Sequence, residues 1–251
     1  MDKPILSVVI AAKEPPRELL MLCLTSFAAL RHGPALDVVL VRSGSLPKLP
    51  EELTASFARF SVVEVPATGV YAAYNAGIPV AAGVHVLFFG VDDVALPGMD
   101  AVIDTLATNP GHFHLYAAAC YMQSVGVAAP SRWRSSLVLR NWCHQGIFYL
   151  RSHLVEHPYH TPYRAQADHK MNIDIVANRS LRFGVSQELV AYFSAGGASS
   201  LRPDIAFRRD FPSIVARAYG RPLGATVKLK QVLIDLLLGD PEQRFQARLR
   251  R

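Results

Sequence analysis

Two adjacent carboxylates, Asp92 and Asp93, end the apolar run Phe88-Phe89-Gly90-Val91. Two desolvated like charges raise each other's pKa unless a cation lies between them. Hard divalent cations such as Mg²⁺ or Mn²⁺ prefer one or two carboxylates together with phosphate oxygens. The pair therefore predicts a metal–phosphate site at the carboxyl end of a strand, where open α/β sheets bind ligands. The alternative is an Asp pair that caps the turn before Pro97-Gly98.

The elements that must position this pair alternate between strand and helix. Short buried apolar runs at residues 5–12, 37–41, 61–65 and 85–90 predict four strands. Helical patterns lie between them, one after Pro15-Pro16 and the others over residues 51–60 and 72–82. Such alternation predicts a parallel sheet with right-handed crossovers. Because neither G-x-G-x-x-G nor G-x-x-x-x-G-K-[ST] occurs, a metal would have to hold any bound nucleotide.

The second half of the chain has a less regular pattern. It predicts a helix over 99–106, a strand over 113–122, a polar loop with a strand over 128–139, a helix over 168–177 and a last strand over 190–193. Neither an internal repeat nor a low-complexity linker separates these segments. We therefore expect one domain over residues 1–202, followed by a basic helical tail over residues 203–251.

Composition and charge narrow the classes of function. Of the 251 residues, 51% are hydrophobic and 18% charged, which favours a sizeable buried core over disorder. The three cysteines are widely spaced, as expected of a chain in a reducing cytoplasm. The net charge of +6 is concentrated toward the end of the chain and favours anionic partners. No nucleic-acid motif is present, so nucleic acid is not an expected partner.

Several segments occur in an order that resembles one known family. They are Ser7-Val8-Val9-Ile10, Ser43-Gly44-Ser45, the Gly69–Ile78 segment GVYAAYNAGI, Phe89-Gly90-Val91-Asp92-Asp93, Cys143-His144-Gln145-Gly146-Ile147-Phe148, Ala165-Gln166-Ala167-Asp168-His169-Lys170-Met171 and Gly196-Gly197-Ala198-Ser199. Together they resemble the inverting family 2 glycosyltransferases with the GT-A fold, of the type that builds bacterial surface glycans. The resemblance covers roughly residues 5–200 and rests on the ordered co-occurrence of the segments.

The resemblance implies a fold and an activity. The fold is α/β: a GT-A-like single domain with a mostly parallel central sheet flanked by helices, plus the C-terminal helical tail. Residues 1–98 would form the nucleotide-sugar-binding half and residues 99–202 the acceptor half. The activity is direct displacement, with inversion, from a nucleotide-diphosphate sugar, with a UDP-sugar favoured, to a saccharide or lipid-linked acceptor. The implied cofactor is Mn²⁺ or Mg²⁺.

The resemblance also assigns roles to individual residues. Asp168 falls at the general base, and burial can raise the pKa of a carboxylate toward the value that this task requires. Asp92 and Asp93 fall at the metal and ribose carboxylates. The acceptor side is assigned to His144 and Gln145. The donor site is assigned to Ala11, Glu14, Arg42, Gly69, Asn75, Asp92 and Asp93.

Each of these residues also has a simpler interpretation. Asp168 could be a helix N-cap, and His144 and Gln145 could be satisfied polar side chains of the core. The remaining simple alternatives are a local hydrogen bond for Asn75, a turn glycine at Gly69 and plain core packing for Tyr71.

Three positions depart from the family pattern: Arg42 replaces an Asp that contacts the nucleobase, and Ala72 and Gly90 replace polar residues. An Arg cannot accept a hydrogen bond from a base N–H, although Glu14 could take over that contact. These departures favour an alternative, a non-catalytic GT-A-fold protein that binds a nucleotide sugar or a partner transferase. A third class, a metal-dependent nucleotidyltransferase or pyrophosphatase, uses the acid pair but gives no role to His144-Gln145.

The tail contains an amphipathic helical pattern over residues 225–238. Its apolar face has Lys228 and Lys230 beside it and consists of Leu229, Val232, Leu233, Leu236 and Leu237. This pattern is typical of a helix that lies on a membrane surface. The alternatives are packing on the domain and a homodimer interface. The expected location is the cytoplasm, with peripheral binding at the inner face of the plasma membrane.

Overall fold

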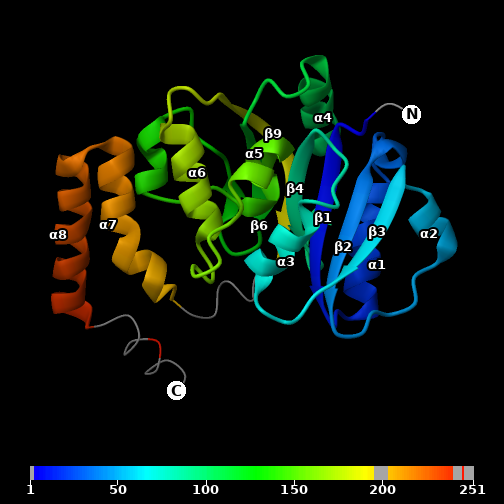
Figure 1. Ribbon diagram of the computed structural model, residues 1–251, viewed down its shortest axis with the longest axis horizontal. Helices are drawn as coiled ribbons and strands as arrows, with labels where there is room; N and C mark the ends of the chain where they lie inside the picture. Colours follow the sequence, from blue (N-terminus) through cyan, green and yellow to red (C-terminus); the bar gives the residue numbers. More distant parts are fainter. Residues whose placement is uncertain (1–2, 195–202, 240–244, 246–251) are drawn as a thin grey trace.

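A single mixed sheet forms the centre of the molecule (Figure 1). The computed structural model describes residues 3–194, 203–239 and 245. The described strands are β1 (Leu6–Lys13), β2 (Asp37–Ser43), β3 (Arg59–Glu64), β4 (His85–Gly90), β5 (Val94–Ala95), β6 (Leu115–Met122), β7 (Gly126–Ala128), β8 (Ile147–Leu150) and β9 (Phe183–Phe193). They pair in the order β3-β2-β1-β4-β8-β6-β9-β5, with β7 added to β6.

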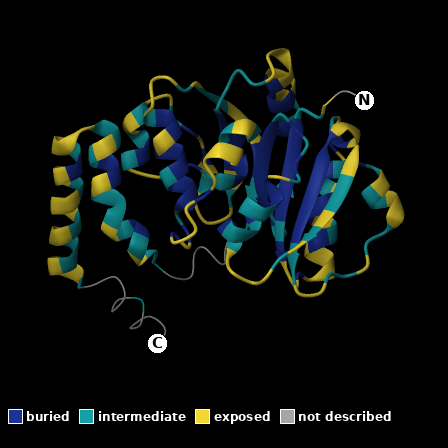
Figure 2. Cartoon of the chain, in the orientation of Figure 1, coloured by how far each residue is buried: buried dark blue, intermediate teal, exposed yellow. Residues whose placement is uncertain are grey.

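Helices cover both faces of this sheet. They are α1 (Arg17–Ala28), α2 (Glu51–Ala55), α3 (Val70–Gly77), α4 (Gly98–Thr108), α5 (Arg151–Glu156), α6 (Ala167–Ala177), α7 (Ile205–Tyr219) and α8 (Arg221–Leu238), with short 3₁₀ turns η1 (Gly33–Ala35), η2 (Arg134–Val138) and η3 (His144–Gly146). Helices α1 and α4 pack with one core cluster, and α3, α6 and α7 pack with the other. The strands between these layers are the most completely buried part of the molecule (Figure 2).

The first half of the chain has the predicted architecture. β1 pairs in parallel with both β2 and β4, and β2 pairs in parallel with β3. The buried runs alternate between the two cores, so that Val8 and Ile10 face one cluster while Val9 faces the other. The four predicted strands and the α/β class are confirmed. All four of these strands end at the same edge of the sheet, and β4 delivers Asp92 and Asp93 there.

Two predicted helices of this half end earlier than expected. The helix predicted over 51–60 ends at Ala55, because the chain must re-enter the sheet as β3 from Arg59 onward. The helix predicted over 72–82 begins at Val70 and ends at Gly77. Pro79 lacks the backbone N–H that would continue the helical ladder, which explains the early end.

The second half differs more from the sequence pattern. Strand β8 was not predicted, and it runs antiparallel to both β4 and β6. Strand β9 begins at Phe183 rather than at residue 190 and pairs in parallel with β6. Only Val190 and Ala191 of β9 are fully buried, so its first part carries no apolar run. Residues 134–138 of the expected polar loop form the 3₁₀ turn η2.

The predicted C-terminal helical segment is confirmed and contains two helices, α7 and α8. Helix α7 packs against α6 and buries Phe207, Ile214 and Val215. The chain then turns at Gly220, whose φ of 100° favours glycine, and α8 returns along α7. None of the described helices is long and apolar enough to cross a bilayer. The expected boundary near residue 202 and the segment Gly196–Ser199 lie outside the described residues.

Candidate active site

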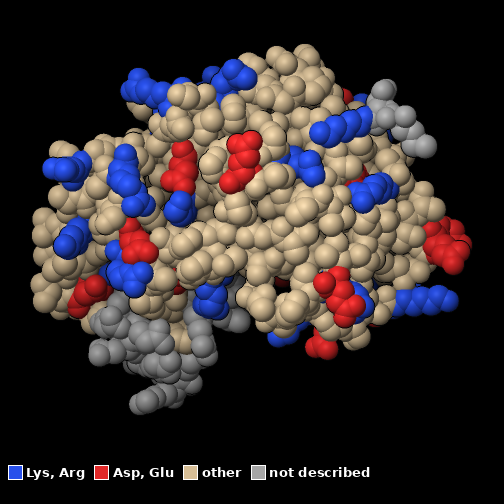
Figure 3. All heavy atoms as spheres, in the orientation of Figure 1, with Lys and Arg blue, Asp and Glu red and all other residues tan. Residues whose placement is uncertain are grey.

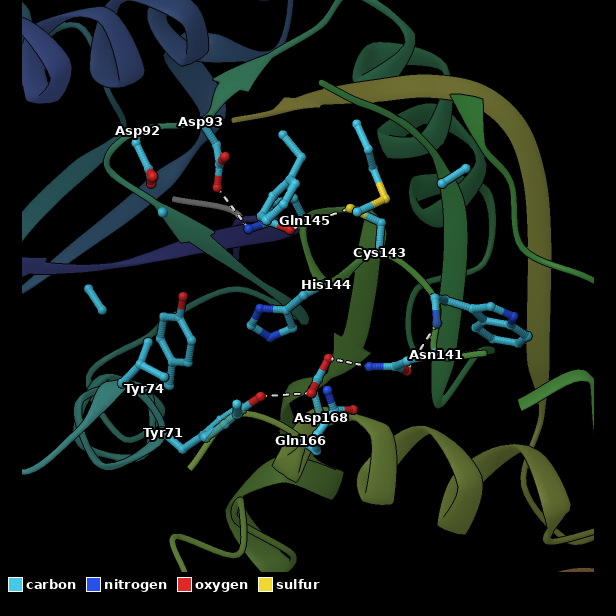
Figure 4. Close-up of a pocket in the computed structure, with 18 of the residues that line it drawn as sticks. Tyr71, Tyr74, Asp92, Asp93, Asn141, Cys143, His144, Gln145, Gln166 and Asp168 are labelled. Atoms are coloured by element: carbon cyan, nitrogen blue, oxygen red, sulfur yellow. Dashed lines mark hydrogen bonds between the residues drawn. The ribbon is translucent and has the colours of Figure 1, made fainter. Parts of the chain in front are cut away.

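A cavity of about 520 Å³ opens at the carboxyl ends of β1 and β4, a size suited to a small-molecule ligand. Its walls come from the β4–β5 turn, α3, the β6–β7 hairpin, residues 140–145 and the start of α6 (Figure 4). Six of the predicted site residues line it: Ala11, Asp92, Asp93, His144, Gln145 and Asp168. The fold therefore brings the predicted acid pair and the predicted base together, although 75 residues or more separate them in sequence.

Asp93 is a buried carboxylate whose partners are neutral. It is 1% exposed, and its Oδ2 accepts a 2.7 Å hydrogen bond from Nε2 of Gln145. Its Oδ1 accepts a 3.0 Å bond from the backbone N–H of Ser194. Burial raises the pKa of Asp93 to about 7, and the charge of Asp92 adds to the rise. Asp93 thus favours a nearby cation, which would stabilise its charged form.

The space around position 90 explains why the residue there is a glycine. A Cβ at Gly90 would lie 2.6 Å from Oδ2 of Asp93 and 2.7 Å from Oδ1 of Asp92. Both carboxylates therefore fold back over the same Cα, and a polar side chain here would displace them. The absence of a side chain at Gly90 therefore leaves room for both carboxylates over the same Cα.

The acid pair fits a divalent cation only as part of a larger set of ligands. Within residues 3–194, 203–239 and 245, no cluster of three or more His, Cys, Asp or Glu side chains could hold a metal ion. Two carboxylates with phosphate oxygens as further ligands are, however, a common coordination set for Mg²⁺. Asp92 and Asp93 are thus suited to a cation that a diphosphate ligand shares.

Asp168 lies across the cavity from the acid pair (Figure 4). Its Oδ1 accepts a hydrogen bond of 2.7 Å from the hydroxyl of Tyr71, and its Oδ2 accepts one of 2.7 Å from Nδ2 of Asn141. The N-cap of α6 is Gln166, so Asp168 is not the cap that the simpler interpretation expected. The 4% exposed carboxylate faces the cavity instead.

Sequence reasoning missed the residues that hold Asp168. Oδ1 of Asn141 accepts a hydrogen bond from Nδ2 of Asn172, and Oδ1 of Asn172 accepts one from the hydroxyl of Tyr149, at 2.9 and 2.7 Å. Asn172 is fully buried. It follows Asp168 by four positions in one helix, and this i,i+4 spacing was the available signal. A chain of neutral donors and acceptors therefore fixes one oxygen of Asp168.

His144 lies among aromatic rings, between the acid pair Asp92–Asp93 and Asp168 (Figure 4). Its ring stacks on Phe88 with centroids 5.8 Å apart and an interplanar angle of 10°, and its Nε2 lies 3.2 Å from the Tyr159 hydroxyl. Burial lowers the pKa of His144, while the charge of Asp168 opposes that shift. A neutral imidazole at this point can exchange hydrogen bonds with a ligand without adding charge.

Four of the predicted donor residues do not line the cavity. Arg42 donates to the Gly44 carbonyl and forms an ion pair with Glu64 on the neighbouring strand. The backbone of Glu14 is in the left-handed region, with a φ of 42°. Gly69 is the N-cap of α3 with a φ of 116°. The side-chain amide of Asn75 bonds the backbone N–H and carbonyl of Tyr159, both at 2.9 Å, so it secures the segment behind His144.

Similarity to known proteins agrees with this geometry. The sequence model described as Glycosyl transferase family 2 matches residues 7–190. A "PGL/p-HBAD biosynthesis glycosyltransferase" of Mycobacterium bovis (strain BCG / Pasteur 1173P2) is 30% identical over 227 residues, which cover 84% of this chain and 86% of that protein. An equally named protein of Mycobacterium tuberculosis (strain ATCC 25177 / H37Ra) has the same identity and coverage. The chain therefore belongs to glycosyl transferase family 2.

Solved structures show the same fold at low sequence identity. S. aureus TarS 1-349 in complex with UDP has a TM-score of 0.66 at 14% identity, covering 93% of this chain and 72% of that one. This chain spans only 44% of a longer TarS chain with the same TM-score. The mannosyltransferase PcManGT from Pyrobaculum calidifontis, in complex with GDP-Man and Mn²⁺, has a TM-score of 0.59 at 15% identity, covering 98% of this chain and 79% of that one. The fold is of the GT-A type, and the protein is a glycosyltransferase.

Proposed function

We propose that the protein is a metal-dependent inverting glycosyltransferase that uses a nucleotide-diphosphate sugar, with a UDP-sugar favoured. The acceptor is the hydroxyl of a saccharide or a lipid-linked glycan made for the cell surface. One observation carries this proposal: the acid pair Asp92–Asp93 and the carboxylate of Asp168 line one cavity. Solved neighbours of this fold in complex with UDP, with UDP-GlcNAc and with GDP-Man and Mn²⁺ support the donor class.

The acid pair and Asp168 divide the reaction between them. The donor diphosphate binds beside Asp92 and Asp93. A divalent cation held by these carboxylates would neutralise charge on the departing diphosphate, a contribution of several kcal/mol. Asp168 accepts the proton of the acceptor hydroxyl. At the same time the hydroxyl oxygen of the acceptor forms a bond to the anomeric carbon, and the bond between that carbon and the diphosphate breaks. Attack from the face opposite the leaving group inverts the configuration. Tyr71 and Asn141 orient the base during this step.

The acceptor side of the cavity is largely apolar. Met122, Val125 and Ala128 of the β6–β7 hairpin line it, and Trp142 and Phe193 add aromatic surface. Apolar walls with a few convergent polar groups are typical of small-molecule sites. This lining supports an acceptor with an apolar portion next to the reacting hydroxyl, and so the lipid-linked class. We accordingly place the enzyme in the cytoplasm, at the inner face of the plasma membrane.

Product analysis tests this proposal. The protein is incubated with UDP-sugars or GDP-mannose, Mn²⁺ and glycolipid acceptors, and NMR identifies both the nucleotide released and the anomeric configuration of the product. We expect an intact nucleoside diphosphate and an inverted linkage. Release of pyrophosphate or a nucleoside monophosphate would indicate a nucleotidyltransferase or pyrophosphatase instead. Donor binding without turnover across the acceptor panel would favour the non-catalytic alternative.

A further inference from the structure

The outer face of α8 is an uncovered apolar surface in the described part of the chain. Leu236 and Leu237 are 77% and 80% exposed, and Leu229, Val232 and Leu233 are each between 46% and 59% exposed. Scattered exposed apolar residues are ordinary on protein surfaces, whereas a contiguous apolar patch marks an interaction site. We call these five side chains the α8 stripe.

Basic side chains border the α8 stripe on both sides. At about 100° per residue, the five side chains occupy an arc of roughly 140° around the helix. On the same helical projection, Lys228 lies just beyond one edge of this arc and Lys230 just beyond the other. Both lysines are exposed. An apolar arc with cationic borders is the arrangement of a helix that lies in a lipid interface, because long Lys side chains reach up to the head groups.

Contacts with α7 fix the rotation of α8 and hold the stripe outward. A Cβ at Gly224 would lie 2.5 Å from the Cβ of Ala216, so the two helices cross in close contact. Arg208 donates a 2.7 Å hydrogen bond to Asp235, and Gln231 donates a 3.1 Å bond to the Arg208 carbonyl. On the helical projection, Gln231 lies opposite the stripe, and Asp235 lies between Gln231 and Lys228. The contacts with α7 therefore leave the stripe uncovered by the described residues.

The charges distinguish a bilayer from a second copy of the chain. Asp235 is the only acidic residue of α8, and its carboxylate is already paired with Arg208 of α7. Two stripes packed on each other would bring the lysines of both copies together, and like charges oppose such pairing. Figure 3 shows several Lys and Arg side chains, with a few acidic side chains among them, at the end of the molecule that α7 and α8 form. Anionic head groups complement this surface.

We propose that the α8 stripe, with Lys228 and Lys230, is a docking surface for a bilayer that contains anionic lipids. The surface itself is carried by α8 alone. Its role in supplying a lipid-linked acceptor rests on the proposed function. Docking through α8 would hold the glycosyltransferase domain at the membrane without a spanning helix, and electrostatic attraction would make the binding sensitive to salt.

Vesicle flotation with the full chain tests the proposal. The probes are phosphatidylcholine vesicles with and without phosphatidylglycerol. We expect the protein to float with the mixed vesicles and Leu236→Glu/Leu237→Glu to remain in solution. Lys228→Gln/Lys230→Gln should bind the mixed vesicles more weakly by about fivefold per lysine. The control, Leu22→Glu/Val155→Glu, adds the same charge at two side chains that are each 53% exposed and should bind like the wild type.

Three outcomes would overturn the proposal. One is a wild-type protein that does not float with mixed vesicles, and another is equal binding by both Glu double variants. The third is a soluble dimer that Leu236→Glu/Leu237→Glu converts to a monomer in sedimentation analysis, which would assign the stripe to a second copy. Transfer to a water-soluble acceptor should be unchanged in the α8 variants. Vesicle binding without any sugar transfer would contradict the proposed function and leave the docking surface intact.

Discussion

Two buried aspartates at opposite ends of the central sheet have partners of different kinds. Asp37, at the amino end of β2, accepts hydrogen bonds from the Ser7 hydroxyl, the Ala82 N–H and the Arg59 guanidinium. Asp93, just beyond the carboxyl end of β4, accepts bonds only from neutral donors among the described residues. Asp37 thus has a cation within the fold, whereas no cation pairs with Asp93 in the described part of the chain.

This difference separates a structural carboxylate from one that is prepared for a ligand. The Asp37 network joins β1, β2, β3 and the segment after α3, so its carboxylate completes the fold. The burial of Asp93 disfavours its charged form, and the hydrogen bonds from Ser194 and Gln145 offset this effect only in part, so its pKa rises to about 7. Groups with perturbed pKa values of this kind concentrate at functional sites. The carboxyl edge of the sheet is therefore the edge where we expect chemistry.

The largest effect should follow removal of the proposed base. Asp168→Asn keeps the size of the side chain but cannot take a proton, so kcat should fall by about 10²–10⁴-fold. Donor binding, measured by calorimetry, should be retained. Asp174→Asn, in the same helix, loses only a surface pair with Lys170 and serves as the control. Full turnover by Asp168→Asn would remove Asp168 from the mechanism.

The structural carboxylate should affect stability instead. Asp37→Ala removes the buried carboxylate and leaves the Ser7 hydroxyl and the Ala82 N–H without an acceptor, which should cost about 1–3 kcal/mol of unfolding free energy per donor. Denaturant titration measures this loss. Asp104→Ala removes exposed pairs with Arg31 and His32 and should cost at most about 1 kcal/mol. Equal losses in the two variants would contradict the assignment of Asp37.

Because its pKa is raised, substitution of Asp93 should stabilise the protein at high pH, whereas substitution of Asp37 should destabilise it. The folded pKa of about 7 lies above the ordinary 3.8, so the stability that protonated Asp93 contributes is lost as pH rises through 7. Asp93→Asn should match the wild type near pH 4 and exceed it in unfolding free energy by roughly 4 kcal/mol at pH 8 in metal-free buffer. Unfolding titrations at both pH values measure the difference. A less stable variant at pH 8 would show that the site does not penalise the charge.

The smallest effect concerns the amide that holds the base. Asn141→Asp would put a second carboxylate within about 3 Å of Asp168, and two carboxylates at this distance resist joint ionisation. The acid limb of the pH–rate profile should therefore move to higher pH by about one unit or more. Asn109→Asp, at an exposed turn, should leave the profile unchanged. A stability loss without a pH shift would limit Asn141 to a structural role.

The first half of the fold could be predicted well from the sequence because most of its strands are continuous apolar runs. Each of β1, β2 and β4 is a nearly continuous buried apolar run, and the run in β4 ends at the acid pair. Only the last residues of β9 could be predicted from the sequence, because polar and exposed side chains interrupt its first part. The site shows a similar contrast. The acids were visible as motifs, but the bond between Tyr71 and Asp168 joins residues 97 positions apart and depends on tertiary packing.

Calorimetric titration of UDP and GDP, with and without Mn²⁺, tests most directly the claim that the acid pair holds the donor diphosphate through a cation. The wild type and Asp93→Ala are compared at one pH. We expect one nucleotide to bind the wild type only when Mn²⁺ is present, and this binding to be lost in Asp93→Ala. Equal binding without Mn²⁺, retained binding in the variant, or no binding of either nucleotide would contradict this claim.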